Sequence, residues 1–172
     1  MLIRAIVAVV TVLTLAPAPL PPAARPDAPW GWPLPGPGAA VVRGFDPPVL
    51  PWEAGHRGVD LLGALDAPVL AAGAGVVTYA GPVAGVGVVT IAHGELRTTY
   101  QPVRATVAIG DRVTVGDQIG TLVRTGSHCA PAACLHWGLL RGDTYLDPLA
   151  MVGRAGRPRL LPLGDRAVAG SG

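Results

Sequence analysis

Residues 67–100 read APVLAAGAGVVTYAGPVAGVGVVTIAHGELRTTY. Short apolar runs rich in Val, Thr and Tyr alternate in this stretch with Gly and Pro, and β-branched and aromatic residues favour strands. We expect strands over residues 68–72, 75–80, 87–92 and 96–100. Strands this short, separated by turn residues, are typical of a sandwich or a barrel.

The same pattern continues towards the C-terminus. Apolar runs cover residues 112–115, 118–123 and 135–140, and the pairs Gly110-Asp111 and Gly116-Asp117 lie between strand-like segments. Gly permits a positive φ and Asp bonds to nearby backbone, so both pairs indicate tight turns. No window of ten or more residues shows a clean helical period. The sequence therefore predicts an all-β domain, a sandwich or a barrel, over residues 53–152.

Composition limits the classes of function. The chain has 172 residues, of which 50% are hydrophobic and 14% are charged, and its formal net charge is +2. This length suits one domain with tails. The sequence has no cluster of basic residues, so we do not expect nucleic acid as a partner. All 13 basic residues are Arg. The absence of Lys excludes Schiff-base chemistry and lysine-tethered carrier domains.

The N-terminus has the pattern of an export signal. Arg4 precedes an apolar run over residues 5–15, and a stretch rich in Pro and Ala ends at Ala24. This order predicts a signal peptide over residues 1–24 and an exported protein, extracellular or in the cell-wall or periplasmic space. The apolar run is too short to cross about 30 Å of hydrocarbon, so we expect no transmembrane span in the mature chain. An uncleaved membrane anchor is the alternative.

Two further segments flank the predicted domain. Residues 25–52 are rich in Pro and contain Trp30 and Trp32. Pro removes helix donors, so we expect an extended lead-in whose Trp side chains pack on the domain. Residues 153–172 are rich in Gly, Arg and Pro and predict a flexible tail.

The chain contains two cysteines, Cys129 and Cys134. In an exported protein a close, even pair favours a disulfide. A loop this short gains little chain entropy, so its role would be to hold the segment before His136. A free Cys134 thiolate acting as a metal ligand is the alternative.

The histidines suggest a metal site. His56 and Asp60 are four residues apart, and in an extended segment residues i and i+4 project from the same face. His136 lies in the strand-like run over residues 135–140. Two His and one carboxylate form a zinc site with a fourth position open, the pattern of catalytic zinc, which polarises a carbonyl and acidifies water. A surface His beside a turn Asp has the same spacing, so spacing alone leaves both interpretations open.

An ordered series of motifs resembles the lysostaphin-type (LytM-like) zinc metalloendopeptidases. These motifs are His56-Arg-Gly-Val-Asp60, Ala67-Pro-Val-Leu-Ala-Ala72, Val89-Thr-Ile-Ala-His93-Gly94, Thr98-Thr-Tyr100, the Gly-Asp repeat up to Gly120, and Leu135-His136-Trp137-Gly138. The resemblance covers about residues 53–149. It implies a mostly antiparallel β-sheet core with an open groove over the sheet, zinc held by His56, Asp60 and His136, and cleavage of peptides in peptidoglycan.

Two positions depart from the family's pattern. Cys134 stands where the family has the first, catalytic His of His-x-His, and Pro102 stands where another catalytic His follows the Tyr. We expect His128, held near the site by the cysteine loop, to supply an imidazole for catalysis. Help from Tyr100 or Gln101 alone is the alternative, as is a surface role for His128.

Three side chains are candidates for the substrate groove. They are Tyr100, Trp137 and His93, although a core position for Trp137 and a structural role for His93 stay open. Two functions follow from the whole pattern: an exported zinc endopeptidase acting on peptidoglycan, or a catalytically degenerate domain that binds wall peptides or regulates a separate hydrolase. The retained metal triad favours the first, and the substituted histidines favour the second.

Overall fold

The structure is a computed structural model that describes residues 29–36, 39–50 and 52–152. The predicted signal peptide and the predicted tail over residues 153–172 lie outside the described residues. No helix in the described ranges is long and apolar enough to cross a membrane. Strands dominate these ranges: β1 (Val41–Arg43), β2 (Val59–Gly63), β3 (Pro68–Leu70), β4 (Gly75–Val83), β5 (Val86–His93), β6 (Leu96–Gln101), β7 (Val103–Ala105), β8 (Arg112–Val113), β9 (Gln118–Leu122), β10 (Ala133–Arg141) and β11 (Thr144–Leu146), followed by the one-turn helix α1 (Leu149–Val152).

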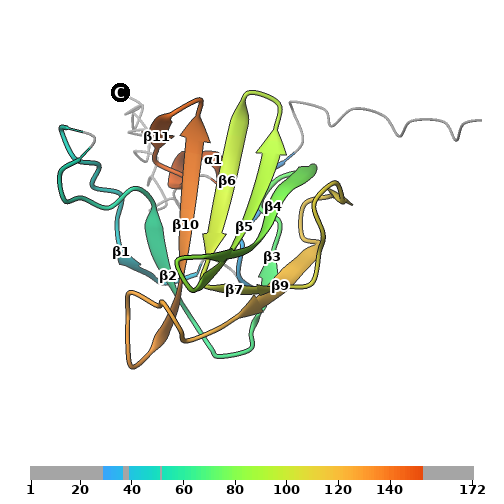
Figure 1. Cartoon of the computed structure of the whole chain (residues 1–172), viewed down its shortest axis with the longest axis horizontal. Helices are drawn as coiled ribbons and strands as arrows, with labels where there is room; N and C mark the ends of the chain where they lie inside the picture. Colours follow the sequence, from blue (N-terminus) through green and yellow to red (C-terminus); the bar gives the residue numbers. More distant parts are fainter. Residues whose placement is uncertain (1–28, 37–38, 51, 153–172) are drawn as a thin grey trace, which may run out of the picture.

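The strands form two antiparallel sheets. The larger has eight strands in the order β1-β2-β10-β6-β5-β4-β8, with β11 paired to β10. The smaller has the order β3-β9-β7. Figure 1 shows β10, β6 and β5 side by side at the centre of the molecule. The predicted all-β, mostly antiparallel fold is confirmed.

Local sequence accounts for most of these strands. Each apolar run that the sequence marks as a strand carries one in the structure. The two Gly-Asp pairs form turns: Gly110 and Gly116 have φ of 95° and 88°, a region that favours glycine. The carboxylates of Asp111 and Asp117 each accept a hydrogen bond from the backbone N–H three residues earlier, at 2.8 and 2.7 Å.

The segment before residue 53 joins the sheet rather than only leading to it. β1 pairs with β2, so the sheet begins earlier in the chain than the sequence indicates. Leu34 is buried, and Trp30 and Trp32 pack against the core. These contacts stabilise the lead-in because they remove large apolar surfaces from water.

The core lies between one face of the large sheet and the small sheet. It is a single cluster of buried apolar side chains, which includes Val59, Leu61, Val89, Ile91, Leu135 and Trp137 from the large sheet and Val69, Ile119 and Leu122 from the small one. Successive strand residues point to opposite faces. The residues between these core positions, Asp60 on β2 and His136 on β10, therefore project from the other face of the large sheet.

Candidate metal centre

Asp60 and His136 meet because of strand register. β2 and β10 pair with His136 directly opposite Asp60, so both side chains leave the same face at the same level. Nδ1 of His136 lies 2.9 Å from Oδ1 of Asp60. His56 and Asp60 do not lie on one extended segment, contrary to the expectation from their spacing. β2 begins at Val59, and His56 is placed instead by an isolated β-bridge to Asp46.

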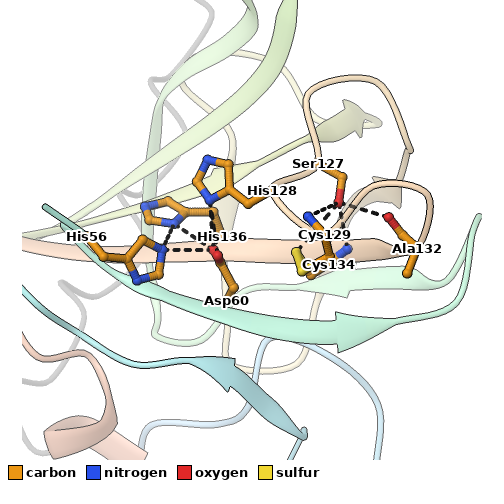
Figure 2. The surroundings of a disulfide bond; sticks show 8 residues. All are labelled: His56, Asp60, Ser127, His128, Cys129, Ala132, Cys134 and His136. Carbon is orange, nitrogen blue, oxygen red and sulfur yellow. Dashed lines mark hydrogen bonds and ion pairs between the residues drawn. A yellow bond between two sulfur atoms is a disulfide. The ribbon is translucent and has the colours of Figure 1, made fainter. Parts of the chain in front are cut away.

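His56 completes a compact triangle of polar atoms (Figure 2). Its Nε2 is 3.0 Å from Oδ1 of Asp60 and 3.0 Å from Nδ1 of His136. The side chains of His56 and Asp60 are only 2% and 1% exposed, and that of His136 is 13% exposed. Buried polar groups at this density need strong mutual interactions or a shared ligand.

A backbone carbonyl sets the orientation of His56. Its Nδ1 lies 2.6 Å from the carbonyl oxygen of Gly44, which can only accept a hydrogen bond. Nδ1 therefore donates, and the lone pair of Nε2 faces Asp60 and His136. A second hydrogen bond of this kind is the usual means by which proteins orient a metal-binding His.

Gly58 leaves the space that the His136 ring occupies. A Cβ at this position would lie 2.8 Å from Nε2 of His136 and 2.5 Å from the carbonyl oxygen of Trp137. Carbon atoms in ordinary contact are about 3.5–4.0 Å apart, so a side chain at Gly58 would displace the ring or β10. The sequence offered no signal for this requirement beyond the Gly in the motif itself.

The loop between β9 and β10 brings a fourth group to the site. Nδ1 of His128 lies 3.1 Å from each oxygen of Asp60. Its side chain is 37% exposed, far more than the other three. The Nδ1 contacts leave Nε2 on the side of the ring away from Asp60 (Figure 2).

The predicted disulfide is present and holds this loop. Cys129 and Cys134 are bonded, with 5.7 Å between their Cα atoms. The Oγ of Ser127 accepts hydrogen bonds from the backbone N–H of Cys129 and Cys134 at 3.2 and 3.0 Å, and donates to the carbonyl of Ala132 at 3.2 Å. The Cys134 sulfur is therefore engaged in a covalent bond, which is not compatible with a free thiolate ligand. Sequence reasoning missed Ser127, because its contacts depend on the folded loop.

The electrostatics of the cluster favour an ionised Asp60 beside a neutral His136. Burial alone would raise the pKa of Asp60, but the hydrogen bond with His136 and the nearby His128, His56 and His136 lower it to about 2. Burial is also the main cause that lowers the pKa of His136, and Asp60 opposes this effect. An ionised carboxylate and a neutral imidazole are the forms that bind metal ions.

The donor atoms fit a zinc ion. Bonds of about 2.0–2.1 Å in a tetrahedral site place ligand atoms roughly 3.3 Å apart. The three distances among His56, Asp60 and His136 are 2.9–3.0 Å, close to this value. Together with His128, their ligand atoms lie within 4.8 Å of one another. Zinc binding itself remains a prediction.

The candidate metal-binding cluster, formed by His56, Asp60, His128 and His136, opens onto a groove over the large sheet. One cleft of about 340 Å³ is lined by all three histidines of the cluster, and also by Thr99, Gln101 and Val88 on the neighbouring strands and by Tyr145. A second cleft of about 420 Å³ shares Thr99 and Tyr145 with the first and continues to Arg97. The two clefts thus form one groove that follows β6 from Gln101, beside the histidines, to Arg97.

The prediction that Tyr100 and Trp137 line the groove is wrong. Both side chains are 0% exposed, because these residues pair across β6 and β10 on the face that packs on the small sheet. Burial raises the pKa of Tyr100 to about 12, and its hydroxyl accepts a hydrogen bond from the N–H of Ala72 at 3.0 Å. Full burial also excludes Tyr100 as a helper in catalysis. Their neighbours Thr99 and Gln101 line the groove instead.

His93 does not line the groove either. Its Nδ1 is 2.8 Å from the carbonyl oxygen of Ala74, and its Nε2 is 2.7 Å from the hydroxyl of Thr98. Its ring packs against Trp30 with 4.8 Å between centroids. His93, at the end of β5, therefore contacts Trp30 of the N-terminal segment, Ala74 just before β4 and Thr98 on β6, and the structural interpretation of this residue is the correct one.

Comparison with known proteins gives consistent matches. Residues 54–148 match the model of Peptidase family M23. An uncharacterized protein of Mycobacterium tuberculosis (strain H37Rv) is 46% identical over 147 residues, which cover 83% of this chain but 58% of that protein. The chain thus spans little more than half of the length of this relative.

Solved structures share the fold. Helicobacter pylori Csd3 superposes with a TM-score of 0.60 and 25% identity, over 74% of this chain and 34% of Csd3. The antimicrobial peptidase lysostaphin from Staphylococcus simulans superposes with a TM-score of 0.58 and 26% identity, over 69% of this chain and 53% of lysostaphin.

Proposed function

The chain belongs to peptidase family M23, and from that premise we propose that it is an exported, zinc-dependent endopeptidase that hydrolyses peptide bonds in bacterial peptidoglycan. The observation that carries the proposal is the set of His56, Asp60 and His136, whose ligand atoms converge beside an open groove. Structural zinc sites are closed by four protein ligands, whereas catalytic sites leave a position for water and substrate. The likeness to lysostaphin, an antimicrobial peptidase, supports a substrate in the cell wall.

His56, Asp60 and His136 would hold the zinc ion, which acts as a Lewis acid that polarises the scissile carbonyl and acidifies the attacking water. Two glycines support this ligand set, because the Gly44 carbonyl orients His56 and the missing side chain of Gly58 leaves room for His136. The groove beside them would hold the peptide in an extended form.

His128 is the proposed catalytic imidazole. The Asp60 carboxylate accepts a hydrogen bond from Nδ1–H, which leaves the Nε2 lone pair available in the groove. An imidazole in this tautomer takes a proton from the attacking water and later gives it to the leaving amine, while the C–N bond breaks. Its greater exposure suits contact with substrate. This role compensates for Cys134 and Pro102, which occupy the family's usual catalytic His positions.

Export is supported by two features. The N-terminal residues have the pattern of a signal peptide. The Cys129–Cys134 disulfide needs an oxidising compartment to persist.

Hydrolysis and zinc content, measured on the same samples, test the proposal. The purified protein is incubated with insoluble peptidoglycan, and released peptides and new amino termini are quantified by mass spectrometry. We expect about one zinc ion per chain, as a single such site predicts, and peptide release for the unaltered protein, and neither for His136→Ala. His128→Ala should keep its zinc and lose about 10²–10⁴-fold in rate. Arg112→Gln, which changes an exposed side chain on β8 that lines neither cleft, should retain the full rate.

Two outcomes would change the interpretation. If His128→Ala loses zinc, His128 is a fourth ligand that closes the site. If the unaltered protein holds zinc and binds peptidoglycan but releases no peptide, it is the second candidate: a degenerate member that binds wall peptides or regulates a separate hydrolase. The substituted Cys134 and Pro102 are the observation that favours this candidate.

A further inference from the structure

The face of the sheet that carries the metal-binding cluster also carries a cation. Arg97 lies on β6, two residues from Thr99 and four from Gln101, so all three side chains project into the groove. Arg97 is exposed. In the described part of the chain, its guanidinium makes no hydrogen bond or ion pair. Its cross-strand neighbours are Leu140 and Ala92, which offer no charged partner.

The groove around Arg97 is rich in hydroxyl groups. Thr78, Thr90 and Thr99 line the second cleft together with Arg97. No Asp or Glu side chain in the described ranges lines either cleft. The cation that lines the other end, Arg57, is already engaged with the carbonyl of Glu53 at 3.3 Å. Arg97 therefore brings several N–H donors into the groove, and none of the described residues that line the groove supplies a carboxylate to accept from them.

We propose that Arg97 binds a carboxylate of the peptide substrate and so selects for peptides with an acidic group at a fixed distance from the cleaved bond. The inference rests on the proposed function, since it assigns the far end of the same groove. A guanidinium presents a planar fork of N–H donors that matches both oxygens of a carboxylate.

Strand register sets the distance. His136 lies opposite Gln101 and Leu140 lies opposite Arg97, so the two levels are four residues apart on β10. At about 3.4 Å per residue this separation is about 14 Å. A peptide that lies extended along the groove rises by a similar amount per residue. Its carboxylate should therefore be about three to four residues from the bond held at the metal-binding cluster.

Charge complementarity can be measured with substrates that differ only in that charge. The probes are soluble muropeptides isolated from peptidoglycan, before and after conversion of their carboxylates to carboxamides. For the unaltered protein, amidation should raise KM by roughly 10- to 100-fold, because hydrogen bonds to charged groups are worth this much. Arg97→Gln should have a similarly raised KM for both forms, with kcat unchanged. Arg97→Lys should recover part of the preference.

Two controls separate this inference from other effects. Arg112→Gln removes the same charge from an exposed position on β8 that lines neither cleft, and it should keep the preference for carboxylates. Trimming one C-terminal residue from the muropeptides moves the chain-terminal carboxylate but leaves side-chain carboxylates in place, so it identifies which of them Arg97 binds.

The outcomes for the two proposals are distinct. Equal KM values for acid and amide forms, unchanged in Arg97→Gln, would overturn the role of Arg97 and leave the peptidase proposal standing. If no hydrolysis occurs at all, the peptidase proposal fails, and binding of the same probes is measured by calorimetry instead. Tighter binding of the acid form, lost in Arg97→Gln, would then support Arg97, and equal binding would refute it.

Discussion

Replacement of Gly58 by Ala should weaken zinc binding without removing any ligand. The added Cβ would lie 2.5 Å from the carbonyl oxygen of Trp137 and 2.8 Å from Nε2 of His136. Both neighbours are in β10, whose residues from 133 to 140 are mostly buried. Separation of these atoms to ordinary contact requires a shift of about 1 Å in the ring or the strand.

The magnitude follows from two separate costs. Overpacking in a well-packed region costs about 1–3 kcal/mol of folding free energy. A shift of this size also exceeds the roughly 0.5 Å tolerance of a preorganised metal site. Loss of support around a metal ligand typically weakens affinity by about 10- to 100-fold. We therefore expect both a lower melting temperature and a larger zinc dissociation constant.

Competition with a fluorescent zinc chelator measures the dissociation constant, and thermal unfolding monitored by circular dichroism measures stability. Gly81→Ala is the matched control, because the three atoms nearest to its Cβ would all belong to the Tyr79 side chain, at 3.4 Å or more, which is ordinary contact. The reasoning fails if Gly58→Ala binds zinc as tightly as the unaltered protein, or if Gly81→Ala weakens zinc binding as much as Gly58→Ala.

The remaining predictions concern the metal, the loop and a buried histidine. In calorimetry, chelation should lower the melting temperature and re-addition of zinc should restore it. Zinc should stabilise the folded protein by about 4 kcal/mol when free zinc is about 1,000 times the dissociation constant. His136→Ala should show no such response. Replacement of both Cys129 and Cys134 by Ser should cost about 2 kcal/mol in a denaturant titration. It should also slow hydrolysis by up to about 100-fold through misplacement of His128, with zinc content unchanged, and an unchanged rate would argue against His128. Burial lowers the pKa of His93, with the Ala74 hydrogen bond opposing, so the folded chain binds fewer protons there than the unfolded chain. The resulting stability is complete above the ordinary His pKa of 6.5 and is lost as the pH falls through the lower folded-state pKa. Acid titration of the unfolding free energy of the zinc-free protein should have a shallower slope in His93→Gln, and equal slopes would contradict this assignment.

Much of the fold could be predicted from local sequence because short strands depend on local patterns. Val-rich runs between turn residues marked most of the strands, and Gly-Asp pairs marked two turns. β1 could not be predicted in this way. Its residues Val41–Arg43 are exposed and lie in a Pro-rich segment, and only pairing with β2 makes them a strand.

The candidate site shows the same division. The motif around His56 and Asp60, together with His136, identified by resemblance the side chains that the structure brings within 3.0 Å of one another. The groove could not be predicted, because its composition depends on which face of β6 is covered. Thr99 and Tyr100 are adjacent in sequence, yet one lines the groove and the other is fully buried.

The sequence by itself determined the β-class and the disulfide-forming pair, since strand propensity and the closeness of two cysteines are properties of the residues themselves, and its ordered motifs identified by resemblance the residues suited to zinc. Only the tertiary structure decided that His128 reaches Asp60, that Gly58 makes room for His136, and that Arg97 shares a groove with the metal-binding cluster. These relations join segments that are distant in the chain, and strand register and the packing of the two sheets fix them.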